Sequence, residues 1–136
     1  MKMIGAVIIT HGQLAECLVE VAESITGKLE NVKTVSVKNS DTTESIRGLL
    51  CSAIKEIDTG GGVLIFTDMF GGTPTNIALS LMEEGKVDVI TGVNLPIVLK
   101  FIGHRNDKRI PELAQHLKEY GQSSIVLAGD MLKEKK

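Results

Sequence analysis

The chain has 136 residues and a formal net charge of −2, and 43% of its residues are hydrophobic. This length allows one domain with a real core, and the lack of a basic excess argues against nucleic acid as a partner. No apolar run reaches the roughly 18 residues that a membrane-spanning helix needs, and the N-terminus shows no signal-peptide pattern. We therefore expect a single cytoplasmic domain over residues 1–136.

The chain opens with the pattern of a strand followed by a helix. An apolar run over residues 5–11 predicts a buried strand that ends at His11. Apolar residues at helical spacing follow, and Gly27 is a plausible stop for that helix. Both cysteines, Cys17 and Cys51, fall on the apolar face of a predicted helix. We expect them to be buried free thiols rather than a disulfide or a metal pair.

The next segment repeats the same alternation. Recurring valines predict a second strand over residues 32–37. The helix after it begins with a variant capping box, in which Asp41 takes the place of the usual Ser or Thr and Glu44 lies three residues later. Residues 63–68 form a third strand that is apolar until its last two positions, as is typical of a strand buried on both faces. That strand ends at Asp68.

A further helix and strand follow a glycine-rich loop. Thr73 is predicted to cap this helix, with Pro74 in its first turn and Gly85 at its end. Residues 87–90 are predicted to form a fourth strand.

The last part of the chain contains two helices in succession, joined by a charged surface link over residues 104–109, and then a late strand over residues 124–128. The whole order predicts an α/β fold with a doubly wound, mostly parallel sheet in strand order 2-1-3-4. We place the late strand at an edge of that sheet, antiparallel to its neighbour.

His11 and Asp68 end two strands that are neighbours in this order. The chain reverses direction between those strands, and at such a switch point an open α/β sheet forms a ligand-binding crevice. A carboxylate can accept a hydrogen bond from one imidazole nitrogen and leave the other free as a nucleophile or base. Either residue alone could serve only to fill or cap a turn, but the pair indicates a site.

The loop after Asp68 supplies a candidate anion-binding segment. Gly71 and Gly72 allow the backbone to bend, and the helix that opens at Thr73 directs its positive end toward the crevice. Two glycines alone would be as typical of a tight turn. Together with His11 they indicate phosphoryl chemistry, whereas the motifs of P-loop, dinucleotide, serine hydrolase and zinc sites are absent.

Three motifs in the chain resemble the enzyme IIA component of mannose-type sugar phosphotransferase systems. The resemblance covers essentially the whole chain, with the motifs in the family's order and spacing. The motifs are Thr10-His11-Gly12, the segment Asp68-Met69-Phe70-Gly71-Gly72-Thr73-Pro74 with Asn76, and Gly92-Val93-Asn94-Leu95-Pro96.

This resemblance implies that His11 accepts a phosphoryl group from the carrier protein HPr and passes it to a IIB component. Asp68 would be the partner of the histidine, and Gly71, Gly72 and Thr73 would hold the phosphoryl oxygens, with no metal and no cofactor. The IIB component would in turn serve a membrane IIC/IID permease.

The resemblance also implies supporting residues and an assembly. Members of the family are typically homodimers that exchange the late edge strand, which is residues 124–128 here. The residues expected to support the site or to contact partner proteins are Thr10, Gly12, Met69, Phe70 and Asn94.

Two other functions remain open from the sequence. The same motifs would serve a regulatory phosphorelay, including the phosphoryl-donor subunit of a dihydroxyacetone kinase system. The same crevice could also belong to an anion-binding module without enzymatic activity, which would form no covalent phosphohistidine.

Overall fold

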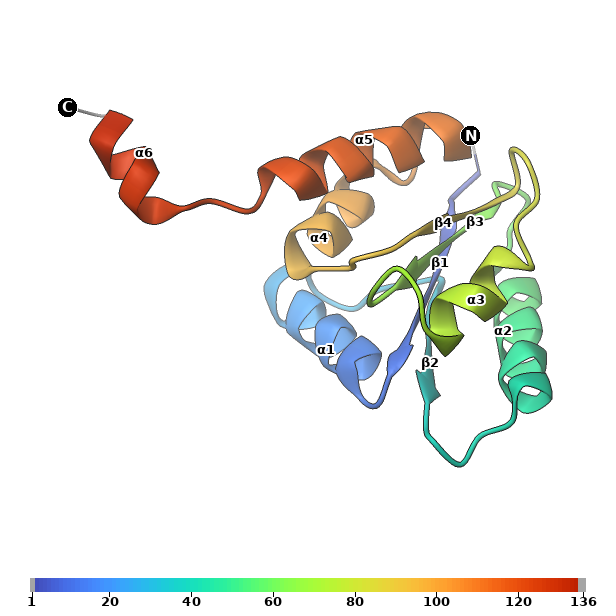
Figure 1. The fold of residues 1–136 in the computed structure, drawn as a ribbon. Helices are drawn as coiled ribbons and strands as arrows, with labels where there is room; N and C mark the ends of the chain where they lie inside the picture. The colour runs from blue at the N-terminus through green and yellow to red at the C-terminus, as the bar shows by residue number, and fades with distance from the viewer. Residues whose placement is uncertain (1, 135–136) are drawn as a thin grey trace.

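Four strands form one parallel sheet in the computed structural model, which describes residues 2–134. The strands are β1 (Gly5–His11), β2 (Val32–Val37), β3 (Val63–Thr67) and β4 (Val87–Ile90). Their order is β2-β1-β3-β4, and each neighbouring pair is parallel. The predicted strand order is confirmed, and it places the carboxyl ends of β1 and β3 side by side (Figure 1).

Helices cover both faces of this sheet, as the doubly wound prediction requires (Figure 1). One face packs against α1, α4 and α5, and the other packs against α2 and α3. Within residues 2–134, no helix combines the length and the apolar character needed to span a membrane. The helices are α1 (Leu14–Thr26), α2 (Thr43–Ile57), α3 (Thr73–Leu79), α4 (Leu95–His104), α5 (Ile110–Ser123) and α6 (Ala128–Glu134).

The alternation of side chains along the two central strands divides the core into two layers. Ile8 and Phe66 lie in the layer beneath α1, α4 and α5, whereas Ile9 and Ile65 lie in the layer beneath α2 and α3. Successive residues of a strand point to opposite faces, so a central strand must be apolar at nearly every position. This is why β1 and β3 are continuous apolar runs in the sequence.

The predicted late strand over residues 124–128 is not a strand in this structure. Residues 125–127 form an irregular segment that leads away from α5, and Ala128 begins α6 (Figure 1). A strand is stable only when its backbone N–H and C=O groups pair with a neighbouring strand, and residues 125–127 pair with no strand in the described part of the chain. Its apolar side chains are left in solvent, and Ile125 is 81% exposed.

The helix α3 is shorter than predicted and ends at Leu79 rather than near Gly85. The Ser80 hydroxyl donates to the Ile77 carbonyl oxygen at 2.6 Å, and the Ser80 backbone N–H also donates to that oxygen. Such local hydrogen bonds compete with helix continuation. The chain then turns toward β4, where the Glu83 N–H donates to the Val87 carbonyl.

The start of α2 also differs from the predicted capping box. Thr42 is the N-cap, and its hydroxyl oxygen accepts the backbone N–H of Ser45 at 3.1 Å. Asp41 instead accepts the backbone N–H of Lys38 at 2.8 Å and closes the preceding turn. A hydroxyl and a carboxylate are both good N-caps, and in this turn the Thr42 hydroxyl is the one that reaches the first N–H groups of α2.

The prediction for the cysteines is wrong for Cys17. α1 buries Ala15 and Ala22 against the sheet, and the Cys17 thiol lies on the exposed side. Cys51 is half-buried, and both thiols are free. The apolar stripe of α1, which includes Cys17, is therefore wider than the face of the helix that packs against the sheet.

Candidate active site

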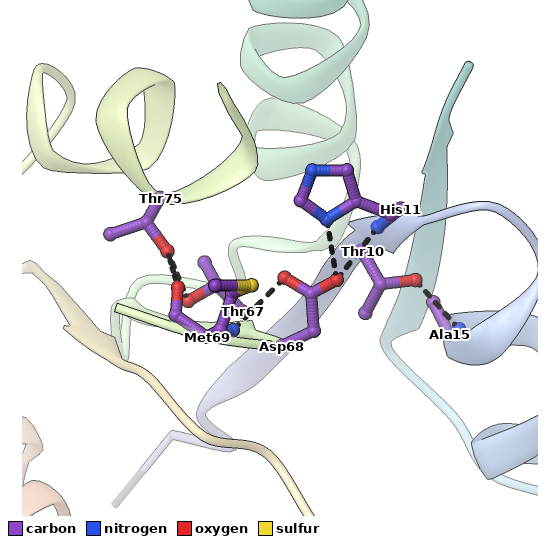
Figure 2. Close-up of polar contacts among 7 residues, drawn as sticks. All are labelled: Thr10, His11, Ala15, Thr67, Asp68, Met69 and Thr75. Atoms are coloured by element: carbon purple, nitrogen blue, oxygen red, sulfur yellow. Dashed lines mark hydrogen bonds and ion pairs between the residues drawn. The ribbon is translucent and has the colours of Figure 1, made fainter. Parts of the chain in front are cut away.

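His11 and the carboxylate of Asp68 are joined by two hydrogen bonds at the edge of the sheet, one from the ring and one from the backbone of His11 (Figure 2). Oδ2 of Asp68 lies 2.8 Å from Nδ1 of His11 and also accepts the backbone N–H of His11 at 2.9 Å. His11 is the last residue of β1, and Asp68 directly follows β3. The parallel pairing of these strands thus places the two groups together, as the sequence predicted.

This contact fixes how the imidazole is presented. A carboxylate only accepts hydrogen bonds, so in the neutral ring Nδ1 of His11 carries the proton and Nε2 keeps its lone pair. The side chain of His11 is 49% exposed and that of Asp68 is 13% exposed, and the second ring nitrogen lies on the side of the ring away from the carboxylate (Figure 2). The arrangement leaves one nucleophilic nitrogen accessible from solvent.

The ionised form of Asp68 is favoured in the folded protein. Burial raises the pKa of the Asp68 carboxyl, but hydrogen bonds from the backbone and ring of His11, with the attraction of that ring, outweigh burial and lower the pKa overall. A charged carboxylate beside the ring can stabilise positive charge that develops on it.

Thr10 and Gly12, on either side of His11, shape the turn that leads into α1. The Thr10 side chain is fully buried, and its hydroxyl oxygen accepts the backbone N–H of Ala15 at 2.9 Å (Figure 2). Gly12 has a φ of +56°, and its N–H donates to the Val37 carbonyl at 2.9 Å. Thr10 therefore supports the site from inside and does not face a partner protein.

The glycine pair of the loop passes close to the His11 ring. Gly72 has a φ of +85°, and a Cβ placed on it would lie 3.3 Å from Cε1 and 3.7 Å from Nε2 of His11. Gly71 has a φ of +88°, but a Cβ on it would contact nothing within 4 Å. The backbone at Gly72 thus lies against the ring edge that carries the free nitrogen.

Thr73 is the first residue of α3, and Gly72 rather than Thr73 occupies the N-cap position. The first N–H groups of a helix have no partner within that helix. Among the described residues, the N–H groups of Gly72 and Thr73 donate to no protein acceptor. They remain available to oxygen atoms of a group bound at His11.

Met69 and Phe70 protrude from the loop, with Phe70 77% exposed. Phe70 also lines a cleft of about 700 Å³ that runs along β4 between α3 and α5. Asn94 lies on the same cleft, where its side-chain oxygen caps α4 by accepting the Ile97 N–H at 3.0 Å. The structure therefore gives Asn94 a capping contact and no hydrogen bond to His11 or Asp68.

Two buried hydroxyls behind the site had no counterpart in the sequence-based prediction. The Oγ1 atoms of Thr67 and Thr75 lie 2.7 Å apart, and the Thr75 hydroxyl also reaches the carbonyl oxygen of Met69 (Figure 2). Both side chains are fully buried. The only sequence signal is a polar residue at the end of an apolar strand and another in the first turns of a helix, and neither forms a motif.

The sequence profile of the family described as "PTS system fructose IIA component" matches residues 5–118. The chain belongs to this mannose-type enzyme IIA family of the sugar phosphotransferase system. The matched range contains both His11 and the loop that follows Asp68. The protein is thus a IIA component of the phosphotransferase system, a class of phosphotransferase proteins in sugar transport.

Relatives and solved structures of IIA components are similar over most of the chain. The fructose-specific EIIA component of Bacillus subtilis is 31% identical over 98% of this chain and 92% of that protein. The mannose-specific EIIAB component of Escherichia coli is 33% identical over 76% of this chain, which corresponds to only 32% of that longer protein. A crystal structure of the IIA protein associated with the fucose utilization operon of Streptococcus pneumoniae is 25% identical, with a TM-score of 0.85 over 97% of this chain and 99% of that one.

Proposed function

We propose that this IIA component is a phosphoryl carrier in which His11 accepts a phosphoryl group from phospho-HPr and passes it to a IIB component. The observation that carries the proposal is the 2.8 Å contact between Nδ1 of His11 and Oδ2 of Asp68. It fixes the neutral ring in the tautomer whose lone pair is on Nε2, which is the form that a nitrogen nucleophile needs.

The transfer exchanges one phosphorus–nitrogen bond for another. The lone pair of Nε2 attacks the phosphorus in line with the leaving histidine of HPr, and the electron pair of the broken bond returns to that ring. His11 keeps its proton on Nδ1 and becomes a positively charged phosphoimidazole, whose charge the Asp68 carboxylate offsets at 2.8 Å. The same steps in reverse order, with a IIB acceptor, discharge His11.

The loop after Asp68 is suited to hold the phosphoryl oxygens. Because the backbone of Gly72 lies against the ring edge that carries Nε2, a phosphoryl group there faces the free N–H groups of Gly72 and Thr73. Hydrogen bonds from these groups stabilise charge on the transferring oxygens. Gly71 supplies the second positive φ that the bend needs, and the mechanism uses no metal or cofactor.

The side chains of Met69 and Phe70 provide exposed apolar contacts beside the site for the two partner proteins. HPr and a IIB component would use the same face in turn, because both must reach Nε2 of His11. A IIB component would then deliver the phosphoryl group to sugar at a IIC/IID permease, while this protein stays in the cytoplasm.

The proposed assembly is a homodimer in which residues 124–128 of each copy add to the sheet of the other. β4 is an edge strand, and the cleft beside it is lined by Leu79 of α3 and Leu117 of α5. Residues 125–127 expose three apolar side chains and pair with no strand of the described chain. An open edge and an unpaired apolar segment complement each other when two copies meet.

Intact-mass analysis after incubation with phosphoenolpyruvate, enzyme I and HPr tests the carrier function. We expect one acid-labile phosphoryl group on the parent chain and none on a His11→Ala variant, and a His116→Gln variant serves as the matched control that retains it. Loss of the label on addition of a cognate IIB component would establish the second transfer. No gain of mass with HPr charged and the chain folded would favour an anion-binding module instead.

A further inference from the structure

We propose that Thr75 is a positioning residue for phosphoryl transfer, which holds the loop of residues 68–72 so that Asp68 stays aligned on His11. This inference rests on the proposed carrier function and extends it to a buried residue that touches neither the phosphoryl group nor His11. The juxtaposition that carries it is the chain of hydrogen bonds from Thr67 through Thr75 to Met69 (Figure 2).

The direction of these hydrogen bonds follows from counting protons. The Thr75 hydroxyl lies within bonding distance of the Thr67 hydroxyl and the Met69 carbonyl. A carbonyl only accepts and a hydroxyl carries one proton, so both contacts are made only if Thr75 donates to Met69. Thr67 then donates to Oγ1 of Thr75. Both hydroxyls are fully buried, where an unpaired polar group is costly.

The backbone of Met69 links these buried hydrogen bonds to the active site. Its N–H donates to Oδ1 of Asp68 at 3.0 Å, while Oδ2 of the same carboxylate binds the ring and backbone of His11. The carbonyl of Met69 has the Thr75 hydroxyl as its hydrogen-bond donor within residues 2–134. Thr75 thus holds the carbonyl of Met69, and the N–H of the same residue orients Asp68.

Thr67 anchors the arrangement to the sheet. It is the last residue of β3, and its backbone carbonyl accepts the Val93 N–H at 2.9 Å. Thr75 lies in α3, so the hydroxyl pair joins the end of a central strand to the helix that follows the loop. The loop is therefore held between two rigid elements at the point where the phosphoryl oxygens would bind.

The central test replaces Thr75 with Val, which keeps the branched shape and removes the hydroxyl. We expect phosphoryl transfer from phospho-HPr to slow by about tenfold, as for small displacements of a catalytic group, with an unchanged KM for phospho-HPr. Thr75→Ser keeps the hydroxyl and should restore the rate. Thr26→Val removes a hydroxyl that donates to the Ala22 carbonyl at the far end of α1 and serves as the control.

A double variant separates positioning from stability. Thr75→Val leaves the Thr67 hydroxyl buried without its partner, whereas Thr67→Val/Thr75→Val removes both hydroxyls and relieves that cost. We expect the double variant to unfold at a higher temperature than Thr75→Val but to transfer as slowly as that variant, because Met69 still lacks its donor. Recovery of the rate together with stability would show that the hydroxyl pair matters only for folding.

The ¹⁵N chemical shifts of the His11 ring provide a readout that a purely structural role would leave unchanged. In the parent we expect the tautomer with the proton on Nδ1, and in Thr75→Val a mixture of the two tautomers. A parent chain that takes up no phosphoryl group would overturn the carrier function itself. A Thr75→Val variant that transfers at the parent rate with a single tautomer would overturn only the role of Thr75.

Discussion

A single oxygen of Asp68, Oδ2, accepts both the ring Nδ1–H and the backbone N–H of His11, at 2.8 and 2.9 Å. The carboxylate therefore fixes the histidine at two points, its ring and its place at the end of β1. A carboxylate that only balanced the charge of the ring would need the contact with Nδ1 and not the contact with the backbone N–H. The second contact makes the angle of the imidazole depend on the position of β3 as well as of β1.

Asp68→Asn should slow phosphoryl transfer by about 10²- to 10⁴-fold, the range associated with loss of an orienting or acid–base group. The amide has no charge to offset the phosphorylated ring, and its NH₂ group can hold the imidazole in the wrong tautomer. Quenched-flow transfer from phospho-HPr would measure the change. Asp107→Asn, beside His104 and outside the site, is the control. An Asp68→Asn rate equal to that of the parent would contradict the role of the carboxylate.

The lowered pKa of Asp68 predicts a specific loss of stability in acid. Burial raises the pKa of this carboxyl, but the hydrogen bonds from His11 bring it below its ordinary value of 3.8. The unfolded chain thus binds a proton at Asp68 at a higher pH than the folded chain does. The stability that this group contributes is complete well above 3.8 and is lost as pH falls from there through the folded pKa.

Urea unfolding at a series of pH values checks this prediction. Between about pH 5 and 3 the free energy of unfolding should fall more steeply for the parent than for Asp68→Asn, which has no carboxyl to protonate at this position. Parallel curves for the two proteins would mean that the carboxyl has the same pKa in both states.

Gly71 and Gly72 offer a matched pair for separating backbone strain from contact with the histidine. Alanine at either position should cost about 1–3 kcal/mol, because both have φ near +85°, and Gly72, with ψ of 168°, lies in a region that is essentially restricted to glycine. Only the methyl group of Gly72→Ala would press on the His11 ring, at 3.3 Å from Cε1. We therefore expect Gly72→Ala to slow phosphorylation and Gly71→Ala to leave it near the parent rate after correction for stability. Equal rates for the two variants would argue against close contact at Gly72.

Arg105 should contribute more to stability than any exposed arginine. Arg105 is 4% exposed, and its guanidinium donates to the carbonyls of Ile4, Glu30 and Asn31 and lies 4.8 Å from the Phe101 ring centre. Arg105→Met would leave these carbonyls without the charged donor and should destabilise the fold by about 3 kcal/mol. Arg47→Met, which removes an exposed guanidinium bonded to Ser80, should cost well below that. Chemical denaturation compares the two.

The proposed dimer predicts that a single charged substitution in residues 124–128 makes the protein monomeric. Val126→Asp would bury a carboxylate beside β4 in the exchanged arrangement, so light scattering should report a monomer. Leu49→Asp changes a residue of similar exposure on α2, 58% against 53% for Val126, and should leave the dimer intact. A parent chain that is monomeric at all concentrations, or a Val126→Asp variant that stays dimeric, would overturn the proposed exchange.

The sheet and the central pair of the site could be predicted from sequence because each rests on a local pattern. The apolar runs before His11 and Asp68 predict buried strands, and the topology that follows brings their ends together. The structure confirms the strand order and places the histidine and the carboxylate in contact. These features depend on residue type and spacing alone.

Other features could not be predicted because they depend on contacts distant in sequence. Arg105 lies in a run of charged residues predicted to be a surface link, and only the folded chain brings it to the carbonyls of Ile4 and Asn31. Thr67 and Thr75 bond through rotamers that no pattern specifies. Residues 125–127 have the composition of a strand, but a strand also requires a partner, and composition carries no information about one.

His11 and Asp68 are 57 residues apart in sequence, and the whole crossover of α1, β2 and α2 lies between them. No short piece of the chain can contain this pair, so the proposed ability to accept a phosphoryl group requires β1 and β3 to be aligned in register. The rate at which refolding chains become able to take up a phosphoryl group would therefore measure how fast β1 pairs with β3. Spectroscopic signals from individual helices do not distinguish this step.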